Sequence, residues 1–155
     1  MVTTRSQPIT EAYVLNQIDT TLIPSGNRSD GSANAWVTIW KFQVPAGIGF
    51  VLGPKDIFAA YIEDAAAEVG NNTCRVRIGI RDTSESDSKV IFGPVPYVSV
   101  KEFQDRRKTA RLNISTPVQV FEEQFIVIDV YDDGVVDESD SAFMLEMHRT
   151  RQGLG

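Results

Sequence analysis

The sequence offers few side chains for covalent or metal chemistry, because it contains one histidine, His148, and one cysteine, Cys74. Nucleophilic hydrolysis by a Ser-His-acid set would need His148. That residue has the opposite parity from Phe143 and Leu145 in an alternating segment, which predicts a surface position. Cys74 falls on the apolar side of its own alternating segment, where a thiol is an inert small hydrophobic group. Zinc sites need several Cys or His ligands. We therefore predict no catalytic centre and no cofactor.

Carboxylates are the remaining candidates for site chemistry, and residues 132–140, DDGVVDESD, concentrate them. Carboxylate oxygens are the hard ligands that calcium prefers, although the spacing here does not match an EF-hand loop. The alternative is a solvated acidic turn in which Asp and Gly satisfy the turn geometry, and we favour it. The residues that would form the calcium site are Asp132, Asp133, Asp137, Glu138 and Asp140.

Charge is distributed unevenly along the chain, which carries 15 basic and 21 acidic residues and a net charge of −6. Such an acidic protein is poorly suited to binding nucleic acid, which carries a negative charge on every phosphate. Residues 101–111 include the basic cluster Arg106, Arg107 and Lys108, whereas residues 112–148 contain nine acids and no Lys or Arg. Neighbouring copies could dock the basic segment on the acidic one in a head-to-tail contact that closes as a ring. The alternative is that both segments are ordinary solvated surface.

Aromatic residues suggest a further binding chemistry, because exposed rings can stack on sugar rings. Four candidates stand out, namely Trp36, Trp40, Tyr97 and Tyr131. Trp36 and Trp40 share one parity with Phe42, however, so we favour a position for this set on the core face of a strand.

The segments that would position these residues have the pattern of β-strands. Apolar residues alternate with polar ones from residue 36 to 44, from 74 to 81 and from 142 to 148, and residues 124–131 form a β-branched run suited to a strand buried on both faces. Turn signals of Gly, Pro and Asx separate these segments at intervals of roughly 8–12 residues. The pattern predicts an all-β, antiparallel β-sandwich of about eight strands, jelly-roll or another Greek key, with a closed barrel as the second choice.

The first 35 residues differ from the rest, because they are rich in Thr, Ser, Asn and Gln. We interpret 1–35 as an N-terminal extended arm and linker, 36–149 as the β-sandwich domain, and 150–155 as a flexible tail. Segment 9–23 carries scattered apolar residues that either bind a partner or form an edge strand on their own domain. The partner-binding residues would be Ile9, Tyr13, Leu15, Ile18 and Leu22.

The polar arm at 1–35, the strand WVTIWKFQVPAG at 36–47 and the alternating strands at 74–81 and 124–131 resemble those of small all-β virion structural proteins. That type includes jelly-roll capsid proteins and the decoration (cement) proteins of phage heads. The resemblance implies a non-catalytic virion subunit that forms homo-oligomers, with a trimer favoured. Its partners would be copies of itself and a capsid protein.

We expect no membrane partner, since no run approaches 18 apolar residues, and no signal peptide, since no basic segment precedes an apolar one near residue 1. The expected location is the virion, after synthesis in the host cytoplasm. The alternative function is a carbohydrate-binding or receptor-binding β-sandwich module, and a small β-sandwich enzyme is a further rival.

Overall fold

The computed structural model describes residues 9–16, 23–65, 67–101, 111–112 and 114–151. These residues form strands and two short 3₁₀ helices, η1 (Ser25–Asn27) and η2 (Tyr97–Ser99). In chain order the strands are β1 (Ile9–Asn16), β2 (Ala35–Gln43), β3 (Ile48–Leu52), β4 (Phe58–Asp64), β5 (Arg75–Arg81), β6 (Ser88–Pro96), β7 (Val118–Val120), β8 (Phe125–Asp132) and β9 (Val136–Arg151).

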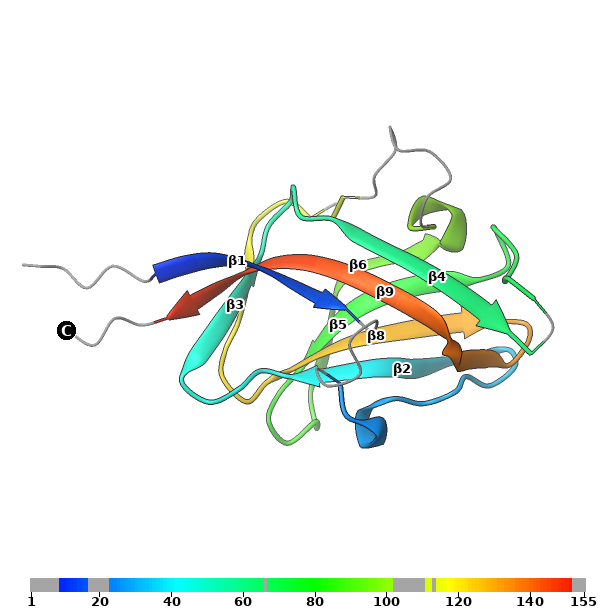
Figure 1. Cartoon of the computed structure of the whole chain (residues 1–155), viewed down its shortest axis with the longest axis horizontal. Helices are drawn as coiled ribbons and strands as arrows, with labels where there is room; N and C mark the ends of the chain where they lie inside the picture. The colour runs from blue at the N-terminus through cyan, green and yellow to red at the C-terminus, as the bar shows by residue number, and fades with distance from the viewer. Residues whose placement is uncertain (1–8, 17–22, 66, 102–110, 113, 152–155) are drawn as a thin grey trace, which may run out of the picture.

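The strands form two antiparallel sheets that pack face to face (Figure 1). One sheet has five strands in the order β1-β9-β3-β7, with β4 also paired to β9, and the other has four strands in the order β2-β8-β5-β6. The chain changes sheet at several connections, including those from β2 to β3, β4 to β5 and β8 to β9, as in Greek-key and jelly-roll sandwiches. The predicted all-β antiparallel sandwich is therefore confirmed.

Segment 9–23 contributes to this same domain. Strand β1 pairs along its whole length with β9 of the same chain, from Ile9 opposite Arg151 to Asn16 opposite Met144. Ile23 is fully buried in the core. The described part of this segment therefore forms an edge strand on its own domain, which was the second alternative. Strand β1 lies at one edge of the five-stranded sheet.

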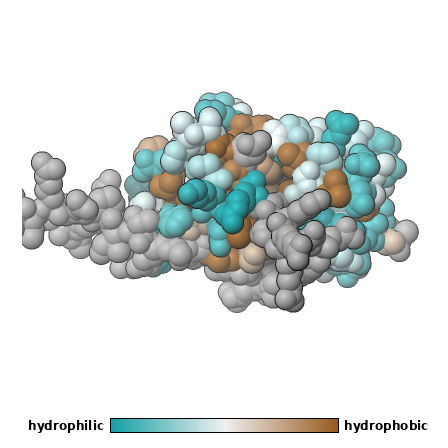
Figure 2. Space-filling model, turned by 90° about the horizontal axis from the view of Figure 1, so that it is seen from above, coloured by the Kyte–Doolittle hydropathy of each residue, from teal (hydrophilic) through white to brown (hydrophobic). Residues whose placement is uncertain are grey.

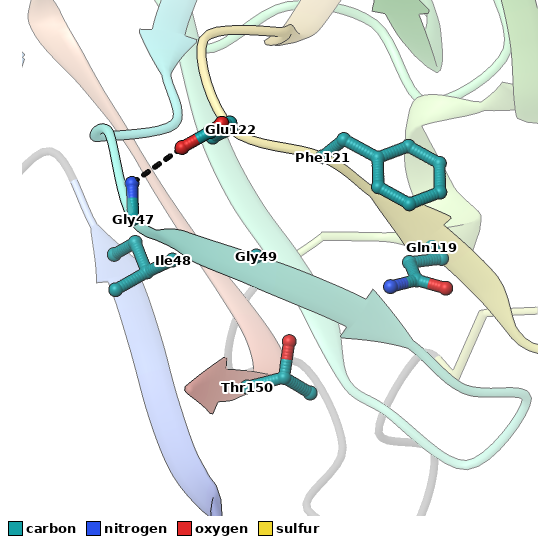
Figure 3. A pocket seen from close by; sticks show the side chains of 7 residues that line it. All are labelled: Gly47, Ile48, Gly49, Gln119, Phe121, Glu122 and Thr150. Atoms are coloured by element: carbon teal, nitrogen blue, oxygen red, sulfur yellow. Dashed lines mark hydrogen bonds between the residues drawn. The ribbon is translucent and has the colours of Figure 1, made fainter. Parts of the chain in front are cut away.

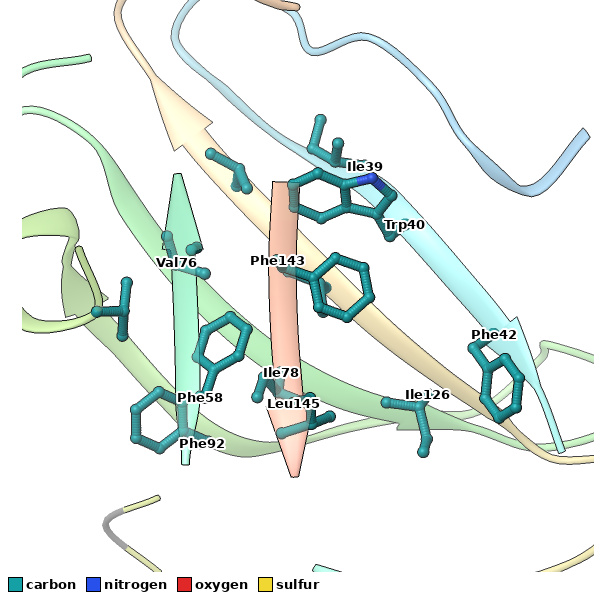
Figure 4. Packing of buried hydrophobic residues seen from close by; sticks show 14 of the residues in the cluster. Ile39, Trp40, Phe42, Phe58, Val76, Ile78, Phe92, Ile126, Phe143 and Leu145 are labelled. Atoms are coloured by element: carbon teal, nitrogen blue, oxygen red, sulfur yellow. The ribbon is translucent and has the colours of Figure 1, made fainter. Parts of the chain in front are cut away.

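Three aromatic pairs join the two sheets across the core, and Figure 4 shows two of them, Trp40 with Phe143 and Phe58 with Phe92. Trp40 of β2 packs on Phe143 of β9 with ring centroids 4.8 Å apart. The other two pairs are Phe42 with Phe50 of β3, and Phe58 of β4 with Phe92 of β6, at 5.8 and 6.0 Å. Each pair takes one ring from each sheet, so aromatic packing holds the layers together along the sandwich.

A β-bulge in β2 changes the alternation that the sequence predicted. The pairing register of β2 with β8 shifts between Thr38 and Trp40, so that Ile39 is the extra residue. Ile39 and Trp40 are both buried, whereas Trp36 lies half-buried on the outer face against Tyr131. The prediction that Trp36 and Trp40 share one face is wrong, because the bulge reverses the parity between them.

Strands β5 and β8 follow their predicted patterns. Val76 and Ile78 are fully buried while Arg75 is exposed and Arg77 half-buried, as expected for a sheet that packs on one face. Strand β8 lies between β2 and β5, and its residues are buried on both sides, including the outward-facing Val127. The prediction of a central, doubly buried strand is confirmed.

The outer face of the four-stranded sheet carries a network around the buried carboxylate of Asp129. Thr38 donates to its Oδ1 at 2.6 Å and Arg77 donates to its Oδ2 at 3.0 Å. Both partners lie directly opposite Asp129 on the neighbouring strands. The Arg77 guanidinium also lies 4.2 Å from the ring centre of Trp36. This network fixes the register of three strands on the face that the core does not cover.

A second buried carboxylate, Asp132, lies where β8 ends, with only 1% of its surface exposed. Its Oδ2 accepts the backbone N–H of Gly134 at 3.0 Å, whereas its Oδ1 has no hydrogen-bond partner among the described residues. Burial raises the pKa of Asp132, the Gly134 hydrogen bond opposes that effect, and the charges of Asp133 and Asp64 raise the pKa further. The ionised form of Asp132 therefore destabilises the fold.

We expect Asp129→Ala to lower the free energy of unfolding by about 2–3 kcal/mol, because it leaves the charge of Arg77 without its partner. Glu85→Ala is the matched control, since Glu85 pairs with Lys41 and Arg81 on the same face but is exposed. Its loss should cost less than about 1 kcal/mol. Urea denaturation measures both values, and equal losses in the two variants would contradict the role given to Asp129.

We expect Asp132→Asn to unfold at a higher urea concentration than the wild type at neutral pH. The pKa of Asp132 is raised in the folded state, so the folded protein binds more protons at this carboxyl than the unfolded chain does. The free energy of unfolding therefore falls as pH rises from the usual Asp range through the raised pKa. The difference between variant and wild type should therefore vanish in acid, where Asp132 is protonated. Asp133→Asn, at an exposed neighbour, is the control and should change stability less. A variant less stable than the wild type at pH 7 would contradict this assignment.

Candidate functional site

The single histidine faces solvent, as predicted. The side chain of His148 is 47% exposed, and its Nδ1 lies 3.7 Å from Oδ1 of the buried Asp56. Asp56 in turn accepts the backbone N–H of Gly53 at 2.7 Å. In the described part of the chain no serine or threonine hydroxyl hydrogen-bonds to His148, so the pair lacks the nucleophile of a hydrolase triad.

The single cysteine is fully buried in the core. Burial, together with the nearby charges of Asp132, Asp133 and Asp64, raises the pKa of the Cys74 thiol to about 12. At neutral pH the group is therefore a thiol and not the thiolate that attacks substrates or binds metals.

The five residues that we considered as calcium ligands do not converge on one point. Asp132 is buried, as described above, and Asp137 accepts both the backbone N–H and the hydroxyl of Ser139. Glu138 accepts the indole N–H of the buried Trp40 at 3.3 Å and lies 3.8 Å from Arg28. Within the residues that the structure describes, no group of three or more His, Cys, Asp or Glu side chains is arranged to hold a metal ion.

The acidic stretch that follows residue 111 is divided between two ends of the sandwich. Glu122 and Glu123 precede β8, whereas Asp133, Asp137 and Asp140 follow it. Eight residues of extended strand span about 26 Å, so these two groups do not form one patch. At the second end the carboxylates crowd each other, since the charge of Asp137 raises the pKa of Asp140.

The predicted partner-binding residues are only partly described. Ile9, Tyr13 and Leu15 lie in β1, but the only β1 side chain described is Val14, which is exposed. The remaining predicted residues, Ile18, Leu22, Arg106, Arg107 and Lys108, lie outside the described residues. Val14 and Met144, which lie on β1 and β9, are exposed apolar groups of the five-stranded sheet.

The four rings that we considered as a platform for sugars are buried or half-buried. Trp40 and Tyr97 are buried, and Trp36 is covered on one face by Arg77 and lies against Tyr131. The Tyr97 hydroxyl is also occupied, because it donates to Glu68 at 3.0 Å and accepts the backbone N–H of Ile62 at 3.2 Å. These four rings contribute to the structure of the sandwich.

An aromatic residue that the sequence analysis did not select, Phe121, is 57% exposed and is the most exposed of the large apolar side chains described. It lies between two shallow hollows of about 270 and 260 Å³ that share Gln119 and Phe121 in their linings. The first also includes Ile48 and Thr150 (Figure 3). In the sequence, Phe121 precedes the pair Glu122-Glu123 in a turn. No alternating pattern there could distinguish an exposed Phe121 from a buried one.

Exposed apolar groups elsewhere are scattered. Figure 2 shows hydrophobic residues interspersed with hydrophilic ones over the described surface on that side of the molecule. The described residues include no helix long and apolar enough to cross a membrane.

No protein-family model matches the sequence, and no curated protein is similar to it. Among solved structures, the chain is similar to VP17, a capsid protein of bacteriophage P23-77, with a TM-score of 0.61 and 7% sequence identity. The similarity covers 94% of this chain and 97% of that chain, so the two share one fold almost from end to end. The predicted resemblance to small all-β virion proteins is thus confirmed, at the level of the fold.

Proposed function

We propose that this protein is a non-catalytic structural subunit of a virus particle, either a capsid protein or a capsid-decorating (cement) protein. The observation that carries the proposal is the fold shared with a phage capsid protein over nearly the whole of both chains. Its partners would be copies of itself and a capsid protein, and its location the virion.

The chemistry of the described residues supports a structural role. The exposed His148 has no hydroxyl partner there, and Cys74 is a buried thiol. A large buried core and satisfied buried polar groups, such as Asp129 with Thr38 and Arg77, are compatible with a shell subunit. They do not require a reaction centre.

Charge complementarity supports self-association. Asp133 and Asp140 are exposed at the β8–β9 end, and the repulsion between Asp137 and Asp140 would be relieved by a cationic partner. The basic residues 106–108 of a second copy provide such charges in the same sequence. A contact between two different surfaces closes into a ring when the rotation permits, and we favour a trimer.

The N-terminal segment is the second element that we assign to association. Strand β1 lies at the edge of its sheet, and no strand among the described residues pairs with its outer side. Such an edge presents backbone N–H and C=O groups to a neighbouring chain. We propose that Ile9, Tyr13 and Leu15, with Ile18 and Leu22 beyond the described strand, contribute to the contact with a neighbouring subunit.

The direct test is to purify the particles that contain this protein. We expect mass spectrometry to find the chain in every preparation, electron microscopy to place it in the shell or on its outer surface, and native mass spectrometry of the isolated protein to give a homo-oligomer. A protein that is absent from purified particles would contradict the proposed function.

We expect the double variant Arg106→Glu/Arg107→Glu to lose the oligomer, because it removes the proposed cationic partner of the β8–β9 end. Asp133→Lys/Asp140→Lys should do the same, and the quadruple variant should regain the oligomer by restoring opposite charges. Asp87→Lys, at an exposed acid of the β5–β6 loop, is the matched control and should leave the native mass unchanged. If the quadruple variant stays monomeric while the control assembles, the proposed charge pairing is wrong.

A further inference from the structure

We propose that the surface around Phe121 binds an uncharged sugar ring, with Phe121 as the stacking platform. The four rings that we considered as a platform, Trp36, Trp40, Tyr97 and Tyr131, are buried or half-buried, and Arg77 covers one face of Trp36. Phe121, in contrast, is an aromatic ring that the fold holds out to solvent. The site is complete in one subunit and does not depend on the proposed virion role.

The backbone that carries Phe121 is fixed in position. Its N–H donates to the side-chain Oε1 of Gln124 at 2.8 Å, and its carbonyl accepts the N–H of Gln124 at 3.2 Å. The same turn bonds to Val44, directly after β2, since the Glu123 N–H donates to the Val44 carbonyl at 2.7 Å and the Val44 N–H donates to the Gln124 carbonyl at 2.8 Å. The backbone position of Phe121 is therefore set before a ligand binds, which lowers the entropy cost of binding.

The hollows on either side of the ring have the size of one small ring system. At about 270 and 260 Å³, each lies below the roughly 300–1,000 Å³ typical of pockets that enclose a drug-sized molecule. The floor of the first is low because Gly47 and Gly49 line it without side chains (Figure 3). A flat ligand can lie against Phe121 and extend into either hollow.

Polar side chains line both hollows beside the ring. Gln119 and Thr150 line the first hollow, and Asp87 and Lys89 line the second. Within the described residues, none of these four side chains makes a hydrogen bond or an ion pair that would compete with a ligand. An amide, a hydroxyl, a carboxylate and an ammonium group together can both donate to and accept from the equatorial hydroxyls of a sugar.

The chemistry of the surface favours a neutral sugar over other ligands. The C–H groups on one face of a pyranose carry a slight positive charge and pack on the negative face of an aromatic ring. The carboxylates of Asp82, Asp87 and Glu122 around the site repel phosphate, sulfate and sialic acid. Beside Phe121 the two hollows also include apolar residues that suit the apolar C–H face of a sugar, namely Ile48, Ile80, Ile91 and Val118.

The test is an NMR titration of the full-length ¹⁵N-labelled protein with methyl β-glucoside, methyl β-galactoside and N-acetylglucosamine, and with sialic acid as the charged comparison. We expect at least one neutral sugar to shift the amide signals of residues 47–49 and 119–124, and sialic acid to bind more weakly. Phe121→Ala should reduce the affinity at least about tenfold, in line with the loss of a stacking contact. Phe121→Tyr should retain binding.

Val135→Ala is the control, because Val135 is also exposed but lies in the β8–β9 turn at the other end of β8. It should bind the same sugar as the wild type does. The proposal is overturned if no neutral sugar shifts these signals, or if Phe121→Ala binds as tightly as the wild type. It is also overturned if Phe121→Ala changes the native mass of the protein while no sugar binds, since Phe121 would then belong to a protein contact.

Discussion

The β-bulge at Ile39 is the constraint on which both faces of the four-stranded sheet depend. One extra residue in β2 lets Ile39 and Trp40 enter the core together, and Trp40 then meets Phe143 of the opposite sheet at 4.8 Å. The same extra residue leaves Trp36 and Thr38 on the outer face, where they contact Arg77 and Asp129. Without the bulge, alternation would place Trp36 and Thr38 on the same face as Trp40.

Buried polar groups show how the sandwich connects its core to its surface. Asp129 is satisfied by two cross-strand donors, and the indole of Trp40 is satisfied by Glu138. Asp132 differs, because one of its oxygens has no partner among the described residues and burial raises its pKa. The hydrogen bonds of Asp129 therefore fix strand register, and the bond from Trp40 to Glu138 joins β2 to β9. The unpartnered oxygen of Asp132, in contrast, lowers the stability of the fold at neutral pH.

The same architecture decides where the acidic and the exposed aromatic residues lie on the surface. The long strand β8 places two acidic groups at opposite ends, so a continuous acidic run in the sequence becomes two separate surfaces. One end carries exposed carboxylates suited to a cationic neighbour, and the other presents Phe121 beside two hollows. Our two proposals, self-association and sugar binding, therefore concern opposite ends of β8.

Features that depend on local periodicity could be predicted from the sequence. The alternation at 74–81 and the β-branched run at 124–131 predicted a half-buried strand and a central strand correctly, because a period of two decides which side of a sheet each residue faces. The same alternation predicted the exposed position of His148 and the buried one of Cys74. Features that depend on contacts between residues distant in the sequence became visible in the fold alone. The bulge, the exposure of Phe121 and the separation of the acids arise from pairing with other strands, and such pairing leaves no regular pattern along the chain.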